Sequence, residues 1–275
     1  MKQEPMPESA EEAGILPREG SASIAYVRRY GNGKSAGAGL PGIVYLGGFR
    51  SDMTGIKATH FDGFARARGQ AFVRFDYRGH GADAVHFRDH TVGDWIADAL
   101  AVLDRLTQGP QILVGSSMGG WIMQHVALAR PGRIVGLVGI ATASDFTERL
   151  IRPNLTDAAR AQLATDGFLT VPSRYDPAGY VLTARLIEDG RRHALLPGPI
   201  PIPIHCPVRL LHGLADPDVP WTLSVELAQA LAGPDVRVTL IKGGDHRLSE
   251  PGELALIEAA VAEMSGAGRD VIDVD

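Results

Sequence analysis

The sequence predicts an α/β fold in which a mostly parallel central sheet carries helices on both faces and a helical lid is inserted between strands. Short apolar runs such as Ile112-Leu113-Val114 alternate with amphipathic stretches along most of the 275 residues, as in repeated strand–helix–strand units. Several runs end in loops of small or polar residues. The alternation stops once, between residues 144 and 205. These observations indicate one α/β domain with a single large insertion.

The individual elements follow from hydrophobic periodicity and from the glycines, prolines and capping residues at their ends. Strands are predicted at 22–30, 42–46, 71–77, 111–114, 134–140, 207–211 and 236–241. Helices are predicted at 58–68, 91–106, 118–130, 221–232 and 249–264. Thr91 and Asp94 have the spacing of a capping box, which fixes the start of the second helix. Parallel strands joined in this way require right-handed crossovers.

The chain is expected to divide into four parts. Residues 1–21 form an acidic, flexible leader, 22–143 and 206–264 form the core, 144–205 form the lid, and 265–275 form a tail. Within the lid, helical pieces are predicted at 146–151, 156–165 and 176–190. Apolar residues of the lid either line a groove for an acyl chain or bury the lid against the core.

Composition excludes several classes of protein. A net charge of −5 argues against nucleic acid as a partner, because phosphate binding requires a basic surface. The only cysteine, Cys206, is interpreted as a buried structural thiol. No apolar run reaches the roughly 18 residues that a membrane span needs. The leader is acidic, unlike a transit peptide, and has no signal-peptide pattern. A cytoplasmic location is therefore expected, with the oligomeric state left open.

The most informative motif is Gly115-Ser116-Ser117-Met118-Gly119, which has the form G-x-S-x-G. It follows the strand at 111–114 and precedes a helical pattern. In that position the motif predicts a sharp strand-to-helix turn that lifts the Ser117 hydroxyl above the sheet edge. An ordinary glycine-rich turn with a capping serine is the alternative interpretation.

Two further polar residues follow other core strands at their carboxyl ends. Asp216 and His246 come after Ser117 in the chain order nucleophile, acid, base. His246 is expected to take the serine proton and Asp216 to orient the imidazole. The backbone amides of Phe49 and Met118 are the candidate oxyanion donors. Asp218 is a less favoured candidate for the acid.

Substrate-binding roles are assigned to side chains near these turns and in the lid, with packing or a solvated turn as the alternative for each: Arg50, His80, Trp121, Arg191 and Arg192. No cofactor and no metal are expected. The glycines at 37–42 spell G-x-G-x-x-G but precede a strand, whereas a dinucleotide fingerprint follows one. No set of His, Asp and Glu residues shows metal-ligand spacing.

With these motifs in place, residues 22–264 resemble the α/β-hydrolase superfamily. Within it the chain is most similar to a mitochondrial branch of acyl-protein thioesterases and acyl-glucuronide esterases. The matching stretches include Gly48-Phe49, residues 74–77 and 109–117, Leu210-Leu211-His212-Gly213, and Asp245-His246-Arg247. The acidic leader departs from that branch, so organelle targeting does not carry over.

The resemblance implies a serine hydrolase with an acyl-enzyme intermediate and a preference for long-chain acyl thioesters or acyl glucuronides. A small-molecule or protein-linked acyl ester is therefore the expected substrate. Two alternatives stay open: a general carboxylesterase for small esters, and a non-catalytic ligand receptor built on the same fold. Labelling of Ser117 by a phosphonate probe distinguishes an enzyme from a receptor.

Overall fold

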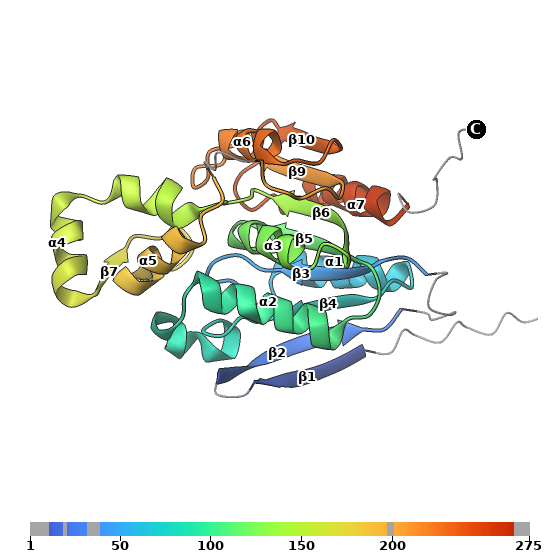
Figure 1. Cartoon of the computed structure of the whole chain (residues 1–275), viewed down its shortest axis with the longest axis horizontal. Helices are drawn as coiled ribbons and strands as arrows, with labels where there is room; N and C mark the ends of the chain where they lie inside the picture. Colours follow the sequence, from blue (N-terminus) through green and yellow to red (C-terminus); the bar gives the residue numbers. More distant parts are fainter. Residues whose placement is uncertain (1–10, 19–20, 32–38, 197–200, 267–275) are drawn as a thin grey trace, which may run out of the picture.

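The computed structural model describes residues 11–18, 21–31, 39–196 and 201–266. Its central sheet has eight strands in the order β1-β2-β4-β3-β5-β6-β9-β10 (Figure 1). Six neighbouring strands of this sheet pair in parallel, in the order β4, β3, β5, β6, β9 and β10, whereas β2 is antiparallel to both β1 and β4. Their bounds are β1 Glu11–Arg18, β2 Ser21–Arg29, β3 Gly42–Leu46, β4 Phe72–Phe75, β5 Gln111–Ser116, β6 Ile134–Ile140, β9 Val208–Gly213 and β10 Val236–Ile241.

Helices cover both faces of the sheet, which confirms the predicted fold class. Helices α1 (Ile56–Ala67) and α7 (Pro251–Gly266) contribute to one buried apolar cluster. Helices α2 (Val92–Leu106), α3 (Met118–Ala129) and α6 (Thr222–Ala230) contribute to the other. The ends of these helices differ from the predicted ones by no more than two residues. Successive side chains of a strand point to opposite faces, so the central strands β3, β4, β5, β6 and β9 supply residues to both clusters.

The predicted capping box at the start of α2 is present. The Asp94 carboxylate accepts a hydrogen bond of 3.0 Å from the Thr91 backbone amide, and the two residues have the reciprocal geometry of the motif. None of the helices in the described part of the chain is both long and apolar enough to cross a bilayer.

The predicted flexible leader is wrong for its second half, because Glu11–Arg18 forms the edge strand β1. Glu12 accepts hydrogen bonds from Tyr26 and Arg28 of β2, at 2.6 and 2.7 Å, and Glu11 pairs with Arg29. The acidic residues that indicated a solvated segment are therefore neutralised across a hairpin. Partly buried and exposed residues alternate along β1, but Leu16 is the only one of its side chains that is fully buried. The hydrophobic periodicity that predicts a strand is therefore weak here. Residues 1–10 lie outside the described part of the chain.

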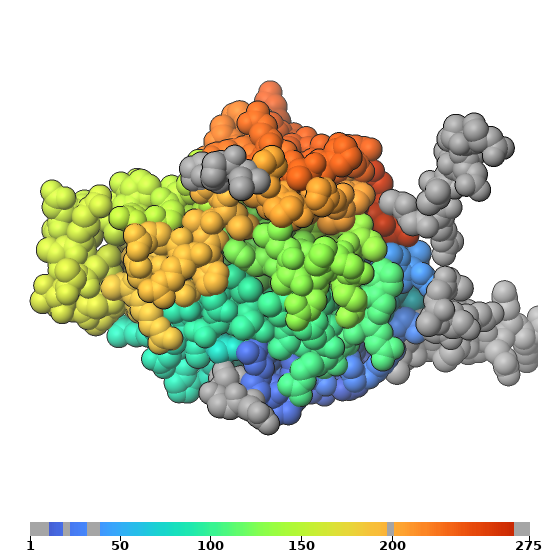
Figure 2. Space-filling view, in the orientation of Figure 1, coloured from blue at the N-terminus to red at the C-terminus, as the bar shows by residue number. Residues whose placement is uncertain are grey.

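The insertion between β6 and β9 forms a lobe at one end of the sheet (Figures 1 and 2). It contains the π-helical turn η2 (Thr147–Ile151), the 3₁₀ turn η3 (Arg152–Asn154), helix α4 (Asp157–Asp166), strands β7 (Phe168–Val171) and β8 (Tyr180–Thr183), and helix α5 (Ala184–Arg192). Strands β7 and β8 pair antiparallel as a separate small sheet. The lid is thus a mixed helix-and-hairpin element.

The helix predicted at 176–190 begins late, at Ala184. Gly179 has a φ of +76°, which turns the chain into the hairpin. Tyr180, Val181 and Thr183 have aromatic or β-branched side chains that favour a strand. The Thr183 hydroxyl then accepts from the Leu186 amide at 3.0 Å and caps α5. At the other end of the chain, the predicted tail begins two residues early, since α7 continues to Gly266; residues 267–275 lie outside the described part.

Candidate active site

Ser117 lies between β5 and α3 in the strained conformation that the G-x-S-x-G motif predicts. Its φ of 54° and ψ of −117° are unfavourable for any residue with a side chain. The turn is tight on both sides: a Cβ added to Gly115 would lie 2.5 Å from the Gly119 oxygen, and one added to Gly119 would lie 2.1 Å from the Leu46 oxygen. Only glycine fits at these two positions, so the sequence allows α3 to start directly above the sheet.

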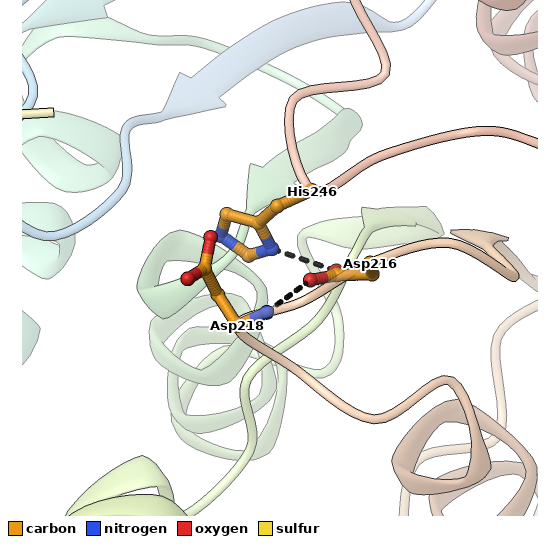
Figure 3. Close-up of side chains that lie close together, drawn as sticks. All are labelled: Asp216, Asp218 and His246. Atoms are coloured by element: carbon orange, nitrogen blue, oxygen red, sulfur yellow. Dashed lines mark hydrogen bonds and ion pairs between the residues drawn. The ribbon is translucent and has the colours of Figure 1, made fainter. Parts of the chain in front are cut away.

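Ser117, His246 and Asp216 form a continuous hydrogen-bonded chain. The His246 Nε2 atom is 3.1 Å from the Ser117 hydroxyl oxygen, and its Nδ1 atom is 2.8 Å from Asp216 Oδ2 (Figure 3). The three residues follow β5, β9 and β10, whose carboxyl ends meet at one edge of the sheet. The sequence prediction that these residues converge therefore agrees with the structure.

Each oxygen of the Asp216 carboxylate accepts two hydrogen bonds. Oδ1 accepts from the backbone amides of Asp218 and Val219, at 2.8 and 2.9 Å. Oδ2 lies 2.8 Å from His246 and 3.1 Å from Nε2 of His212. Burial alone would raise the pKa of Asp216, but the hydrogen bonds from the two histidines outweigh it and hold the pKa well below its usual range. An ionised Asp216 must receive the Nδ1 proton of His246, which leaves Nε2 as the acceptor that faces Ser117.

The alternative acid, Asp218, has a different partner. Its Oδ2 atom accepts a hydrogen bond of 2.5 Å from the Tyr175 hydroxyl, which belongs to the lid. Asp216, Asp218 and His246 each offer a ligand atom within 4.8 Å of the others (Figure 3). This grouping does not fit a cation, because the Asp216 oxygens and His246 Nδ1 are already occupied by hydrogen bonds within the protein.

The two candidate oxyanion amides flank Ser117. Met118 is the first residue of α3, where the N–H group has no partner within the helix. Phe49 lies in the loop after β3, and the preceding Gly48 is so close that a Cβ added to it would be 3.4 Å from the Ser117 Cβ atom. The Phe49 amide has no acceptor within the described residues. Both groups are therefore free to donate to an oxygen above Ser117.

A cavity of about 940 Å³ opens at Ser117 beneath the lid. Its walls include the candidate site residues Phe49, Ser117, Met118 and His246. One part of the remaining wall is formed by apolar side chains from the β6–η2 segment and the hairpin of the lid: Ala143, Phe146, Leu150, Ile151, Val171, Tyr180 and Leu182. Another part carries charged side chains, among them Arg50, Lys57 and Arg247. The cavity therefore joins the reaction centre to an apolar wall on the lid side and to a charged wall.

Of the residues assigned to substrate binding from the sequence, only Arg50 lines this cavity. Arg191 and Arg192 lie at the exposed end of α5, where Arg191 pairs with Glu188 at 2.7 Å. Their amphipathic helix turns its polar face to solvent, away from the cavity. The structure thus corrects the substrate-binding prediction for these two arginines in favour of the solvated turn.

Trp121 and His80 are also absent from the cavity wall. Trp121 is fully buried on α3 and packs edge-on against Phe146 at 5.5 Å. His80 is 2% exposed and lies behind the loop that carries Phe49. Both side chains pack against buried aromatic rings, so the structure corrects the substrate-binding prediction for Trp121 and His80 in favour of packing.

Sequence reasoning missed the contacts that join the lid to the core. Tyr175 donates to Asp218, and its ring lies 4.8 Å from the Arg247 guanidinium carbon. Asp176 lies 3.5 Å from Arg50. These pairs connect residues far apart in the chain, so no local periodicity or spacing could have found them. His212 lies 3.1 Å from Asp216 and thereby helps to fix the acid, a contact that the sequence did not indicate.

The strand order, the elbow at Ser117 and the relay to Asp216 are the features of an α/β hydrolase. Residues 40–256 match the Alpha/beta hydrolase family, so the chain belongs to that family and is a hydrolase-class enzyme. It is 41% identical over 253 residues to the mouse protein named palmitoyl-protein thioesterase ABHD10, mitochondrial, covering 91% of this chain and 81% of the relative. The human protein of the same name is 39% identical over 251 residues, covering 91% and 79%.

Solved structures show the same relationship. Alpha/beta hydrolase domain-containing protein 10 from mouse superposes with a TM-score of 0.81 at 39% identity, covering 92% of this chain and 98% of that one. A putative hydrolase from Agrobacterium vitis superposes with a TM-score of 0.85 at 40% identity, covering 94% and 99%. The resemblance expected from the sequence motifs is confirmed.

The predicted cytoplasmic location is contradicted by these relatives. The proteins from mouse, rat, cattle and human are all named as mitochondrial. The prediction depended on the acidity of the first residues. Two of these acidic residues, Glu11 and Glu12, belong to the folded edge strand and pair with arginines of β2, so they do not mark a solvated leader.

Proposed function

We propose that the chain is a serine-dependent acyl hydrolase that cleaves long-chain acyl thioesters through an acyl-enzyme intermediate. Ser117 is the nucleophile, His246 the general base and acid, and Asp216 the group that orients His246. The observation that carries the proposal is the hydrogen-bonded chain Ser117–His246–Asp216 beside a cavity that has an apolar wall on the lid side. The names of the relatives supply the substrate class.

In the first half-reaction, the Ser117 oxygen attacks the acyl carbonyl carbon while His246 Nε2 takes the hydroxyl proton. The carbonyl π electrons move to oxygen, and the amides of Phe49 and Met118 donate to the resulting oxyanion. The imidazolium is stabilised by the ionised Asp216. When the tetrahedral intermediate collapses, the bond to sulfur breaks, the thiol leaves with the proton from His246, and the acyl group stays on Ser117.

The second half-reaction uses the same groups with water as the nucleophile. His246 removes a proton from water as the oxygen attacks the acyl carbon, and the same two amides stabilise the second oxyanion. Collapse breaks the bond to the Ser117 oxygen, which recovers its proton from His246. The products are a fatty acid and the regenerated enzyme.

The acyl preference is proposed from the chamber beneath the lid. Its wall of Phe146, Leu150, Ile151, Val171 and Leu182 offers only apolar contact, and each buried methylene gains about 0.8 kcal/mol. A long acyl chain therefore gains more from this chamber than an acetyl group does.

Two series of acyl-chain lengths, from acetyl to palmitoyl, test this proposal when presented as thioesters and as p-nitrophenyl esters. We expect kcat/KM to rise with chain length in both series and the palmitoyl thioester to be cleaved well. A preference for acetyl and butyryl esters, with no cleavage of the palmitoyl thioester, would instead indicate a general carboxylesterase for small esters.

An acyl glucuronide is a second candidate substrate, favoured by cationic residues in the cavity wall. Arg50, Lys57 and Arg247 all line it, and Lys57 donates only to the Arg247 carbonyl, with no carboxylate partner in the described residues. Burial lowers the pKa of Lys57 to about 8, which leaves it charged at neutral pH. Comparing the hydrolysis of an acyl glucuronide with that of its glucuronate methyl ester tests this candidate, because only the acyl glucuronide carries a free carboxylate. Lys57→Met should lower kcat/KM for the acyl glucuronide and leave kcat/KM for the methyl ester nearly unchanged.

A further inference from the structure

The loop that carries Phe49, residues 47–55, is held by β4 and by the chain that follows it. Met53 is fixed at both ends of its backbone: its amide donates to Asp76 at 2.6 Å, and its carbonyl accepts from Arg74 at 2.7 Å. A third contact lies nearer to Ser117, where the Arg50 amide donates to Nε2 of His80 at 3.2 Å. This contact is the one adjacent to the Phe49 amide.

The hydrogen bonds of His80 define its tautomer. Its Nδ1 atom lies 3.2 Å from the Arg78 carbonyl oxygen, which can only accept. Nδ1 must therefore carry the proton, and Nε2 must be the unprotonated nitrogen that accepts from Arg50. The same carbonyl also accepts from the Trp95 indole at 3.1 Å. The imidazole is thus a neutral group with one fixed donor and one fixed acceptor.

The backbone at Arg50 needs this support. Its φ is 60°, a left-handed conformation that is strained for a residue with a side chain. The Ser51 amide closes this turn by donating to the Gly48 oxygen at 3.1 Å, and His80 holds the peptide between Phe49 and Arg50 inside it. Loss of the His80 contact would free that peptide to rotate, and the change in the Phe49 backbone angles would redirect the Phe49 N–H relative to Ser117.

The ring of Phe49 is held by the same group of aromatic side chains that holds His80. Phe49 contacts Phe87 and Trp95 edge-on, with ring centroids 5.0 and 5.9 Å apart. His80 contacts these two rings at 5.3 and 5.2 Å. The imidazole is therefore held in one position, and its hydrogen bond with the Arg50 amide restrains the loop backbone.

We propose that His80 is a positioning residue for the reaction: its unprotonated Nε2 atom fixes the Arg50 peptide and thereby aims the neighbouring Phe49 amide at the oxyanion. The inference rests on the proposed function, in which that amide stabilises the tetrahedral intermediates. His80 touches neither the substrate nor Ser117. His80 therefore affects the reaction rate only through the steps in which negative charge develops on the carbonyl oxygen.

Two substitutions of similar length test the acceptor directly. His80→Met removes it, whereas His80→Gln replaces Nε2 by an amide oxygen that can still accept. Loss of one oxyanion donor lowers kcat by about 10²-fold, so we expect His80→Met to approach that loss with little change in KM. His80→Gln should recover most of kcat. Affinity for a trifluoromethyl ketone that forms a tetrahedral adduct should fall with kcat in the methionine variant.

A matched control separates positioning from general destabilisation. Val102 is fully buried on α2, and Val102→Ala lowers the unfolding temperature without touching the loop. If His80→Met loses no more kcat than Val102→Ala, or if His80→Gln is as slow as His80→Met, the inference is wrong. A direct measurement needs no variant: ¹⁵N NMR should show His80 protonated at Nδ1 alone, and a proton on Nε2 would overturn the inference.

Failure of the proposed function has a different signature. If the wild-type protein cleaves no acyl thioester or ester, or if Ser117→Ala keeps full activity, the proposed function falls irrespective of His80. If the wild type is active, Ser117→Ala is inert and His80→Met retains full kcat, only the role of His80 is refuted.

Discussion

Ser117 and His246 are separated by 129 positions in the chain, yet the serine oxygen and the imidazole Nε2 atom are 3.1 Å apart. The contact exists because β5 and β10 are parallel strands of one sheet whose carboxyl ends open onto the same edge. A hydrogen bond of this length allows the histidine to take the serine proton without a large movement. The geometry of the resting enzyme is therefore already close to that needed for attack.

Asp216 is predicted to be the acid of the site. Asp216→Asn keeps the shape of the side chain but removes the charge and favours the wrong tautomer of His246, so kcat should fall by about 10³- to 10⁴-fold. The free energy of unfolding should fall as well, because an amide nitrogen cannot accept the hydrogen bonds that a carboxylate oxygen accepts. Steady-state kinetics and an unfolding curve for the variant measure both effects.

The neighbouring carboxylate provides the comparison. Asp218→Asn alters only the contact with Tyr175 of the lid, and we expect kcat to stay within about tenfold of the wild type. If Asp218→Asn lowered kcat more than Asp216→Asn did, the catalytic acid would be Asp218.

Gly119 is predicted to be essential although it has no side chain to take part in chemistry. A Cβ there would lie 2.1 Å from the Leu46 oxygen and 2.6 Å from the Gly47 oxygen, so Gly119→Ala must push β3 and the oxyanion loop away from α3. Overpacking of this kind costs about 1–3 kcal/mol or more. Gly132→Ala, at a site with nothing within 4 Å, is the control and should unfold like the wild type.

Much of this site could be predicted from residue spacing. Ser117, Asp216 and His246 each follow an apolar run in a recognisable order, and parallel strands leave only one edge where such turns can meet. The capping box at Thr91 and the glycines of the elbow were visible for the same reason: they depend on neighbours in the sequence.

Features that depend on distant partners could not be predicted. β1 looks like a solvated leader until Glu12 is seen to accept hydrogen bonds from Tyr26 and Arg28. Arg191 and Trp121 were assigned to the substrate because their chemistry is suitable, but helix orientation directs one to solvent and the other into the core. The location prediction counted Glu11 and Glu12 as part of a solvated leader, although their charges are paired within the folded sheet.

Acid should destabilise the fold through His80. Burial is the main cause that lowers the pKa of its imidazole from 6.5 to about 4, with Arg50 and His90 acting in the same direction and the Arg78 carbonyl and Asp83 opposing them. Above pH 6.5 the imidazole is neutral in both states and contributes no pH dependence. Between pH 6.5 and 4 only the unfolded chain binds the proton, so the free energy of unfolding falls as the pH falls.

Urea unfolding of the wild type and of His80→Gln at pH 7, 5.5 and 4.5 measures this contribution. The free energy of unfolding of the wild type should fall by up to about 3 kcal/mol relative to that of His80→Gln as the pH is lowered, because glutamine does not titrate. The stability advantage of the wild type should therefore narrow or reverse. A difference that stays constant with pH would show that the imidazole is not held neutral in the folded protein.

The central claim is that Ser117 carries the acyl group, and labelling with a fluorophosphonate followed by peptide mass mapping tests it most directly. We predict a single phosphonylated residue, Ser117, with labelling abolished in Ser117→Ala, retained in Ser116→Ala, and slowed at least tenfold in an Asp216→Asn variant. Labelling at another serine, or none in a folded wild-type protein that still cleaves acyl thioesters, would contradict the account.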